Sequence, residues 1–339
     1  MPFGEYMGEW LYGEGGYYAS MPIIGKKGDF ATSVTTSMFF GGTIAKRLLS
    51  LIESGFLSKR ACVVEIGAHH GYLSADIAQF VYTLKPELLK TLTFVIIEPL
   101  EILQKAQEKY LYEAFGDAVK FSWFKSLKEF FCDEAFVVSN ELFDAFACEV
   151  VKGGKMLYME GHEALFGEIK GKTKELCDKY GVTTGEIATG YEEFALNLSR
   201  SIKKCEFITF DYGQKGVRSD ISLRVYQGHK TYPFFSLTKY AKNEKLKDLS
   251  LHSLYKKSDL TYDVNFSYLK DAFEAVGFKE TAFCAQSKAL VEFGLTELLE
   301  ILKNSVGENK YRMELGKALQ LIDPSFLGER FSMIRFQKA

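Results

Sequence analysis

The chain has 339 residues, of which 47% are hydrophobic and 25% are charged, and its formal net charge is −2. This composition is typical of a globular protein with a large core, and the near-neutral, mixed charge argues against a nucleic-acid-binding protein. No stretch approaches the roughly 18 consecutive apolar residues that a membrane-spanning helix needs. The sequence therefore predicts a globular protein without a membrane span, built as one large domain with insertions or as two domains.

The cysteines and the N-terminal residues indicate in which cellular compartment we expect the protein. The six cysteines include no Cys-x-x-Cys pair, and Cys62, Cys205 and Cys284 lie in apolar segments, which predicts buried side chains in a reducing compartment. Glu5 and Glu9 come early, and no basic start followed by an apolar stretch is present, so we expect a cytoplasmic location. The five histidines have no ligand partners at metal-binding spacing, so no metal site is expected.

Residues 25–33, GKKGDFATS, form a loop of glycine and small polar residues ahead of an apolar, periodic segment from Thr36 to Leu57. The periodic segment predicts a helix. Two interpretations of the loop stay open: Thr32 or Ser33 caps the helix, or the loop is a lid over a ligand. We expect residues 1–58 to be a loop and helix that cover a cofactor site, and residues 59–339 to form the main domain.

The segment ACVVEIGAHHGYLSADI, residues 61–77, predicts a strand, a tight turn and a helix. The apolar run stops at Gly67, Gly71 follows, and apolar residues then recur at helical spacing. At the carboxyl end of a strand, such a turn directs backbone amides toward a ligand. Counted from Gly67, the third position is His69 and the sixth is Tyr72, so the spacing disfavours a dinucleotide-binding oxidoreductase. The alternative is that these are ordinary turn glycines.

Acidic residues follow the first two strands of this region. Glu65 closes the first strand, and the strand TFVIIE ends at Glu98. This arrangement suggests that an adenosine joined to a sulfonium amino acid binds here. A carboxylate at Glu98 offers only acceptors, which suits the two hydroxyl groups of a ribose.

Strands and helices then alternate, which predicts a parallel sheet. We expect a helix to about Leu84, a helix after Pro99, a strand over Val119–Phe124 and a helix over Ser126–Phe131.

Polar residues interrupt an apolar sequence after the strand Ala135–Ser139. Asn140, Glu141 and Asp144 follow at what should be the carboxyl edge of the sheet. We expect Glu141 and Asp144 to be catalytic carboxylates that hold a cationic substrate. The alternative interpretation is a helix cap and a solvated turn.

The second half of the chain predicts insertions and a regular tail. Hairpin-like and then helical patterns predict a cap insertion over about 149–203, and a long irregular stretch predicts a second one over about 214–262. Between them, the strand CEFITF ends at Asp211. The tail predicts helices over 266–276, 287–302 and 309–321, a strand to Cys284, and a last strand, FSMIRF, at the sheet edge.

The ordered motifs GKKGDFATS, EIGAHHGYL, NELFDAF, DYG, DVNFSYL and LGERF resemble, nearly end to end, the MidA-like family of S-adenosylmethionine-dependent methyltransferases. The mitochondrial members of that family are linked to respiratory complex I assembly as protein arginine methyltransferases. The resemblance implies an α/β fold: a Rossmann-like class I methyltransferase sheet with inserted helical and hairpin elements and an N-terminal helical segment.

The resemblance also implies an activity: methyl transfer from S-adenosyl-L-methionine to a protein side chain, with arginine as the expected target and a respiratory complex subunit as the expected partner. It implies catalytic roles for Glu141 and Asp144. The residues expected to bind the cofactor are Gly28, Asp29, Thr32, Ser33, Glu65, Gly67, Ala68, His69, Gly71, Glu98 and Asn140.

This chain departs from the family pattern at three places near the expected site. His69 replaces the usual third glycine of the turn, Val34 and Thr35 replace Pro-Glu, and Ala147 replaces a proline. A side chain at position 69 stands where glycine allows close approach of the backbone. The alternative function is therefore a binding or assembly protein on a catalytically weakened methyltransferase scaffold.

Overall fold

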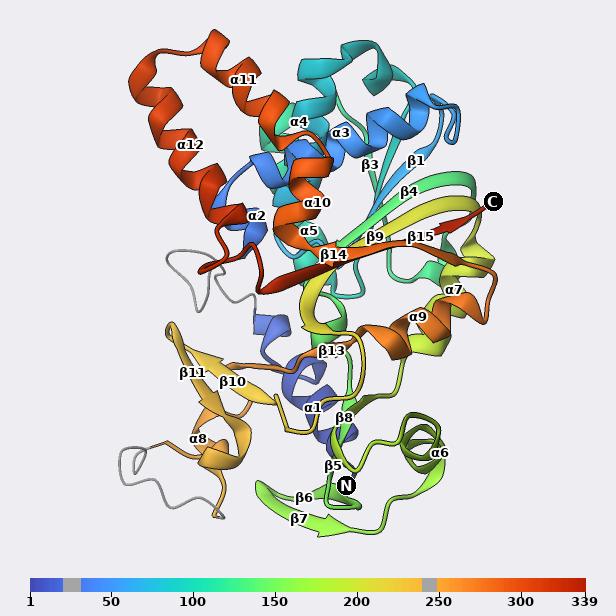
Figure 1. Cartoon of the computed structure of the whole chain (residues 1–339), viewed down its shortest axis with the longest axis vertical. Coiled ribbons are helices and arrows are strands. Elements are labelled where there is room, and N and C mark those ends of the chain that lie inside the picture. The colour runs from blue at the N-terminus through green and yellow to red at the C-terminus, as the bar shows by residue number, and fades with distance from the viewer. Residues whose placement is uncertain (21–31, 240–248) are drawn as a thin grey trace. The chain divides into compact units, whose positions relative to one another are not determined.

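The structure is a computed structural model that describes residues 1–20, 32–239 and 249–339 (Figure 1). The chain forms two compact units: unit 1 contains Met1–Phe30, Phe143–Phe194 and Tyr212–Leu269, and unit 2 contains Ala31–Leu142, Ala195–Asp211 and Lys270–Ala339. The segments predicted as cap insertions overlap unit 1. The role of residues 1–58 as a cover for the cofactor site stays a prediction.

A mixed sheet with the strand order β14-β15-β9-β4-β1-β2-β3 forms the centre of unit 2 (Figure 1). Strands β3, β2, β1, β4 and β9 pair in parallel, and β14 pairs antiparallel with β15. The predicted parallel sheet is confirmed. The strands are β1 (Cys62–Ile66), β2 (Thr93–Ile97), β3 (Phe121–Phe124), β4 (Cys132–Asn140), β9 (Ile202–Gln214, whose last residues belong to unit 1), β14 (Lys279–Ala285) and β15 (Phe331–Lys338).

The central strands are apolar along their length because helices cover the sheet. Val63 and Val64 of β1 are buried, as are Phe136 and Val137 on β4. The register places Glu65 beside Ile96 of β2 and Val138 of β4, so the ends of these three strands meet at one edge.

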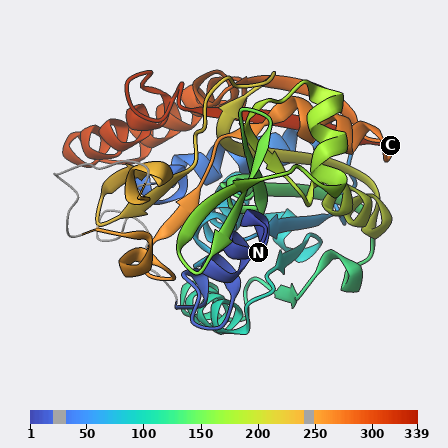
Figure 2. The same ribbon diagram turned by 90° about the horizontal axis from the view of Figure 1, so that it is seen from below.

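The helices of unit 2 pack on one another as well as on the sheet. Helix α3 packs against α4, and α11 and α12 lie side by side in both views (Figures 1 and 2). The helix expected over 126–131 is only a short 3-10 turn, Leu127–Glu129. The helices are α2 (Ser33–Thr36), α3 (Phe39–Glu53), α4 (Tyr72–Leu84), α5 (Glu101–Phe115), α10 (Gln286–Glu292), α11 (Leu295–Ser305) and α12 (Glu308–Ile322). Each of α7 (Tyr191–Ser201) and α9 (Phe266–Glu274) has its first residues in unit 1 and its last residues in unit 2.

Unit 1 contains two small antiparallel sheets, with the orders β7-β6-β5-β8 and β11-β10-β12, and the expected hairpin is confirmed as β5 and β6. The strands are β5 (Cys148–Lys152), β6 (Lys155–Glu160), β7 (Glu163–Gly167), β8 (Thr184–Ala188), β10 (Arg224–Gln227), β11 (Lys230–Pro233), β12 (Asp259–Thr261) and β13 (Val264–Asn265), which pairs with the end of β9. The helices are α1 (Phe3–Tyr12), α6 (Gly171–Tyr180) and α8 (Leu251–Leu254).

Four expectations about secondary structure and sheet order are wrong. Strand β8 interrupts the segment expected to be helical, and β10, β11 and α8 lie in the stretch expected to be irregular. Asp211 lies within β9 rather than at its end. Strand β15 lies between β14 and β9, so it is not at the sheet edge. Among the residues that the structure describes, no helix has the length and apolar character needed to cross a membrane.

Candidate active site

The turn between β1 and α4 has the backbone conformation that its glycines predict. Gly67 has a φ of 73° and Gly71, which precedes the first residue of α4, has a φ of 81°. Both angles lie in the left-handed region, which favours glycine. A Cβ atom at Gly67 would also lie only 3.1 Å from Leu142 Cδ1, beside the exit of β4. The turn therefore needs glycine at Gly67 for both its conformation and its packing.

His69 adopts a left-handed conformation in this turn, with a φ of 47°. Such a conformation costs a residue other than glycine about 1 kcal/mol. The His69 ring packs edge-on against the His70 ring, with centroids 4.2 Å apart, and the His69 carbonyl accepts a hydrogen bond from Gln107 Nε2 at 2.8 Å. The turn therefore keeps a glycine-like conformation with a histidine in place, at the cost of backbone strain.

Glu65 ties the end of β1 to the first turn of α4. The residue is only 5% exposed, and its carboxylate accepts hydrogen bonds from the Ser74 backbone N–H, at 2.9 Å, and from the Ser74 hydroxyl. Burial raises the pKa of Glu65 to about 7, against the lowering effect of these hydrogen bonds. Glu65 therefore orients the helix whose N-terminus faces the ligand edge of the sheet.

Glu98 follows β2 and is 3% exposed. Its Oε1 accepts a hydrogen bond from the Leu100 backbone N–H at 3.1 Å, and its Oε2 accepts one from Gln107 Nε2 at 3.2 Å. Both donors are uncharged, and burial raises the pKa of Glu98 to about 7. The carboxylate therefore keeps capacity to accept further hydrogen bonds from a ligand.

The exit of β4 carries an amide with a buried oxygen and an acid with a strained backbone. Asn140 Nδ2 donates to Glu141 Oε1 at 2.8 Å, whereas Asn140 Oδ1 is buried and has no hydrogen-bond donor within the described parts of the chain. Glu141 has a φ of 51°, and its backbone N–H donates to the Phe210 carbonyl at 2.9 Å. Because an unsatisfied buried acceptor is costly and strained residues cluster at functional sites, this exit is suited to a ligand that supplies a donor.

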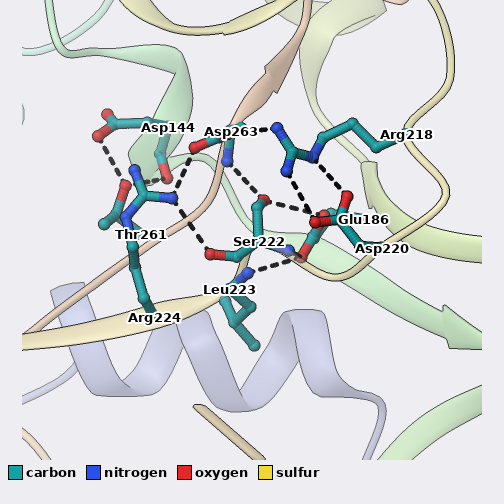
Figure 3. Close-up of polar contacts among 9 residues, drawn as sticks. All are labelled: Asp144, Glu186, Arg218, Asp220, Ser222, Leu223, Arg224, Thr261 and Asp263. Carbon is teal, nitrogen blue, oxygen red and sulfur yellow. Dashed lines mark hydrogen bonds and ion pairs between the residues drawn. The ribbon is translucent and has the colours of Figure 1, made fainter. Parts of the chain in front are cut away.

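Asp144 belongs to unit 1, where it is buried and its Oδ2 accepts a hydrogen bond from Thr261 Oγ1 at 2.7 Å (Figure 3). Burial raises its pKa to about 6. Figure 3 shows that Asp144 is part of a larger group, which we call the unit 1 polar cluster: Asp144, Glu186, Arg218, Asp220, Ser222, Leu223, Arg224, Thr261 and Asp263.

Asp263 pairs with two arginines inside the unit 1 polar cluster. Asp263 accepts hydrogen bonds from Arg224 at 2.6 Å and from Arg218 at 2.8 Å. Glu186 accepts from the backbone N–H groups of Ser222 and Leu223, each at 2.7 Å (Figure 3). Glu186, Arg218 and Asp263 line an open pocket. Because Asp263 is held by two arginines and Glu186 by backbone N–H groups, these two acids fit a supporting role better than a role in binding a charged ligand.

The N-terminal residues of the expected site are described only in part. Thr32 caps α2 in a reciprocal capping box with Thr35, so the capping interpretation is confirmed for Thr32, on a shorter helix than expected. The Ser33 hydroxyl donates to Gln286 Oε1 at 2.8 Å, and both residues are buried. Gly28 and Asp29 lie outside the described residues. Cofactor contacts from all four positions stay a prediction.

Gln107 is a residue of this edge that sequence analysis did not single out. It is fully buried and contacts both the turn after β1 and the acid after β2. One signal was present: Leu103, Gln107 and Leu111 form the buried face of α5, so an amide stands between two leucines on an apolar stripe. A polar residue in such a position needs hydrogen-bond partners, which points to a buried polar network.

These side chains fit an S-adenosylmethionine-type ligand. Glu65, Gly67, Ala68, His69, Gly71, Glu98 and Asn140 all lie at the carboxyl ends of β1, β2 and β4. The strand order reverses between β1 and β4, which is where open α/β sheets bind ligands. The acceptor oxygens of Glu98 and Asn140 suit the hydroxyl and ammonium donors of such a ligand.

Comparison with known proteins finds relatives among methyltransferases. Residues 43–284 match a family profile described as "Putative S-adenosyl-L-methionine-dependent methyltransferase". The protein arginine methyltransferase NDUFAF7 of mouse is 24% identical, covering 96% of this chain and 78% of that protein, and the human NDUFAF7 is 22% identical, covering 97% and 78%. A crystal structure of a methyl transferase candidate from Burkholderia thailandensis, bound to S-adenosyl-homocysteine, has a TM-score of 0.79 at 20% identity and covers 100% of this chain and 88% of its own.

The comparisons correct one expectation and confirm others. The expected cytoplasmic location is contradicted, because the mouse, rat, human and zebrafish relatives are mitochondrial proteins. The expected Rossmann-like methyltransferase fold is confirmed by the solved relative, and the expected cofactor, S-adenosyl-L-methionine, is confirmed by the family match. The chain therefore belongs to the MidA-like family of S-adenosyl-L-methionine-dependent methyltransferases.

Proposed function

We propose that this enzyme transfers the methyl group of S-adenosyl-L-methionine to an arginine side chain of a protein. The observation that carries the proposal is the similarity to protein arginine methyltransferases over 96% of the chain or more. A subunit of a respiratory complex is the substrate that we propose, in line with the family resemblance.

When bound, the cofactor supplies an electrophilic methyl group on a sulfonium, and the residues of the chain supply alignment and electrostatic stabilisation. We propose that Glu98 accepts hydrogen bonds from the ribose hydroxyls and that the unsatisfied Asn140 Oδ1 accepts one from a further donor of the cofactor. Gly67 and Gly71 allow the backbone to approach it closely.

Glu141 is the carboxylate that we propose for the substrate. A guanidinium is a planar cation with a fixed set of donors, and a carboxylate can hold it in a bidentate pair while it draws positive charge away from the attacking nitrogen. The left-handed backbone at Glu141 is a strain that a functional site can explain. Asp144 is the second proposed carboxylate, but it is already engaged by Thr261, so we assign the larger effect to Glu141.

Glu141→Gln tests the assignment because it keeps the shape of the side chain and removes its charge. We expect methylation of an arginine-containing peptide to fall by about 100-fold or more while S-adenosylhomocysteine affinity is retained, since the lost interaction belongs to the transition state. The measurement is transfer of label from methyl-labelled S-adenosylmethionine, with a lysine-for-arginine peptide as substrate control. Glu113→Gln, an exposed acid on α5, is the matched protein control.

The alternative role of Glu141, as the cap of a helix, leads to a different outcome: a stability loss of about 1 kcal/mol with near-normal turnover. Normal turnover would remove Glu141 from the catalytic residues. Equal labelling of the arginine and lysine peptides would contradict an arginine target. Absence of S-adenosylmethionine binding at millimolar concentration would favour a scaffold that has lost catalysis.

The proposed partner calls for a separate assay. Isolated respiratory complexes, incubated with the enzyme and labelled S-adenosylmethionine, should acquire methylarginine on a subunit that mass spectrometry identifies. Unlabelled complexes, in the presence of an active peptide assay, would contradict the proposed partner while leaving the arginine specificity intact.

A further inference from the structure

Gln107 is a polar residue buried on an apolar face of its helix. It lies on the buried face of α5 between Leu103 and Leu111, and its exposed fraction is 0%. Burying a side-chain amide is unfavourable unless its donors and acceptor are hydrogen-bonded. Here Nε2 donates to the His69 carbonyl at 2.8 Å and to Glu98 Oε2 at 3.2 Å, and Oε1 accepts from Trp123 Nε1 at 3.0 Å.

The chemistry of the three partners fixes the orientation of this amide. The Trp123 indole is a donor only, so it requires the Gln107 oxygen. The His69 carbonyl and the Glu98 carboxylate are acceptors, so they require the amide N–H groups. A rotated amide would place its oxygen against two acceptors and its N–H groups against a donor. The indole therefore keeps both Gln107 donors aimed at the cofactor edge of the sheet.

These contacts connect two segments that are far apart in sequence. His69 belongs to the turn after β1, and Glu98 follows β2. One side chain from α5 thus sets the position of the turn backbone relative to the carboxylate. Since Glu98 has uncharged donors on both oxygens, loss of Gln107 would remove one of the two hydrogen bonds that hold its rotamer.

We propose that Gln107 is a positioning residue of the cofactor site, which holds the Glu98 carboxylate and the His69 turn at the separation that one cofactor molecule requires. This inference rests on the proposed placement of the cofactor ribose at Glu98. It assigns to Gln107 an effect on ribose recognition, exerted through Glu98 rather than by direct contact.

The test compares binding of S-adenosylhomocysteine and of its 2′-deoxy analogue by calorimetry. A hydrogen bond from a ribose hydroxyl to a carboxylate should make the natural ligand bind about tenfold more tightly to the unchanged enzyme. Gln107→Met keeps the length of the side chain and removes its donors. We expect S-adenosylhomocysteine affinity to fall about tenfold in this variant and the preference over the deoxy analogue to fall below about threefold.

A purely structural role for Gln107 would weaken both ligands equally and leave the preference intact, which would overturn the inference. Gln79→Met is the matched control, because Gln79 is exposed on α4 and its amide donates a hydrogen bond to Thr83, one turn along the same helix; both affinities should be unchanged. Trp123→Phe is a second variant in case Gln107→Met does not fold. It removes the donor that fixes the amide, so the preference should fall by about threefold, and an unchanged preference would count against the inference.

Glu98→Ala separates this inference from the proposal on which it rests. If Glu98→Ala leaves S-adenosylhomocysteine affinity unchanged, the placement of the cofactor at Glu98 is wrong. If Glu98→Ala weakens binding and abolishes the ribose preference while Gln107→Met preserves that preference, the placement holds and the role of Gln107 is wrong.

Discussion

Glu98 in unit 2 and Asp263 in unit 1 are largely buried acids that the protein holds in different ways. Asp263 lies between two guanidinium groups, those of Arg224 and Arg218. Glu98 has only uncharged donors, the Leu100 backbone N–H and the Gln107 amide. The charge of Asp263 is therefore compensated within its own unit, whereas Glu98 is buried without a cation among its hydrogen-bond donors.

The difference indicates different uses of a buried carboxylate. An acid paired with arginines inside the protein stabilises the segments that carry them, and breaking such a pair is costly. An acid held by neutral donors alone keeps a raised pKa and can gain from a ligand that brings donors or positive charge. We therefore assign structural support to Asp263 and its two arginine partners, and ligand recognition to the edge of the unit 2 sheet.

The largest effect is expected on the structural side of this comparison. Arg224→Ala would leave Asp263 with one of its two guanidinium partners, and we expect the free energy of unfolding to fall by about 3 kcal/mol. Urea denaturation provides the measurement. Arg312→Ala is the matched control: its pair with Glu308 is exposed on α12, so a loss of about 0.5 kcal/mol or less is expected. Equal losses in the two variants would contradict the assignment.

The titration of Glu98 should make the free energy of unfolding depend on pH. Burial raises the pKa of Glu98 from its ordinary value of 4.5, which we take for the unfolded chain, to about 7 in the folded chain. Between pH 4.5 and pH 7, the folded state therefore binds more protons than the unfolded state. The contribution of Glu98 to stability is therefore present below about pH 4.5 and is lost as the pH rises toward 7, with a slope of at most about 1.4 kcal/mol per pH unit.

Glu98→Gln removes this titration. Urea denaturation of the ligand-free protein between pH 5 and 8 should show the variant gaining stability relative to the unchanged protein as the pH rises. A constant difference across that range would mean that Glu98 is ionised throughout, as an acid compensated in the manner of Asp263 would be.

The smallest effect concerns the strained turn. His69→Gly should raise the free energy of unfolding by about 0.5 kcal/mol, because relief of the left-handed strain slightly exceeds the greater chain entropy of glycine in the unfolded state. Thermal unfolding provides the measurement. His70→Gly is the control, because the backbone of His70 is not in the left-handed region. We expect this variant to lose about 0.5 to 1 kcal/mol of the free energy of unfolding. Destabilisation by both would show that the His69 ring packing outweighs its strain.

Local sequence patterns predicted the strands and helices at the centre of the unit 2 sheet. The glycine turn and the alternation of apolar strands and helices predicted β1, α4, β2, α5 and the parallel sheet, because buried parallel strands are continuously apolar. Strands β10 to β12 were not predicted, since they are short and follow a stretch without clear alternation. The position of β15 inside the sheet depends on pairing with β9 and β14, which are distant in sequence.

The candidate site was predictable to a similar extent. Glu65, Glu98 and Asn140 lie at the carboxyl ends of strands, so their convergence at one edge follows from parallel pairing. Gln107 was not recognised because its partners, His69, Glu98 and Trp123, come from three other elements, and only the fold brings them together. The hydrogen bond from Thr261 to Asp144 was not predicted for the same reason, because Thr261 belongs to strand β12, which is distant from Asp144 in sequence.

Calorimetric titration of S-adenosylhomocysteine into the unchanged protein and into Glu98→Ala tests the central claim most directly. With the cofactor at the carboxyl ends of β1, β2 and β4, the variant should lose about 1.5 to 3 kcal/mol of binding free energy, the typical value of a hydrogen bond to a charged group, with little loss of folding stability. Equal affinity in the two proteins would contradict the placement of the cofactor at this edge.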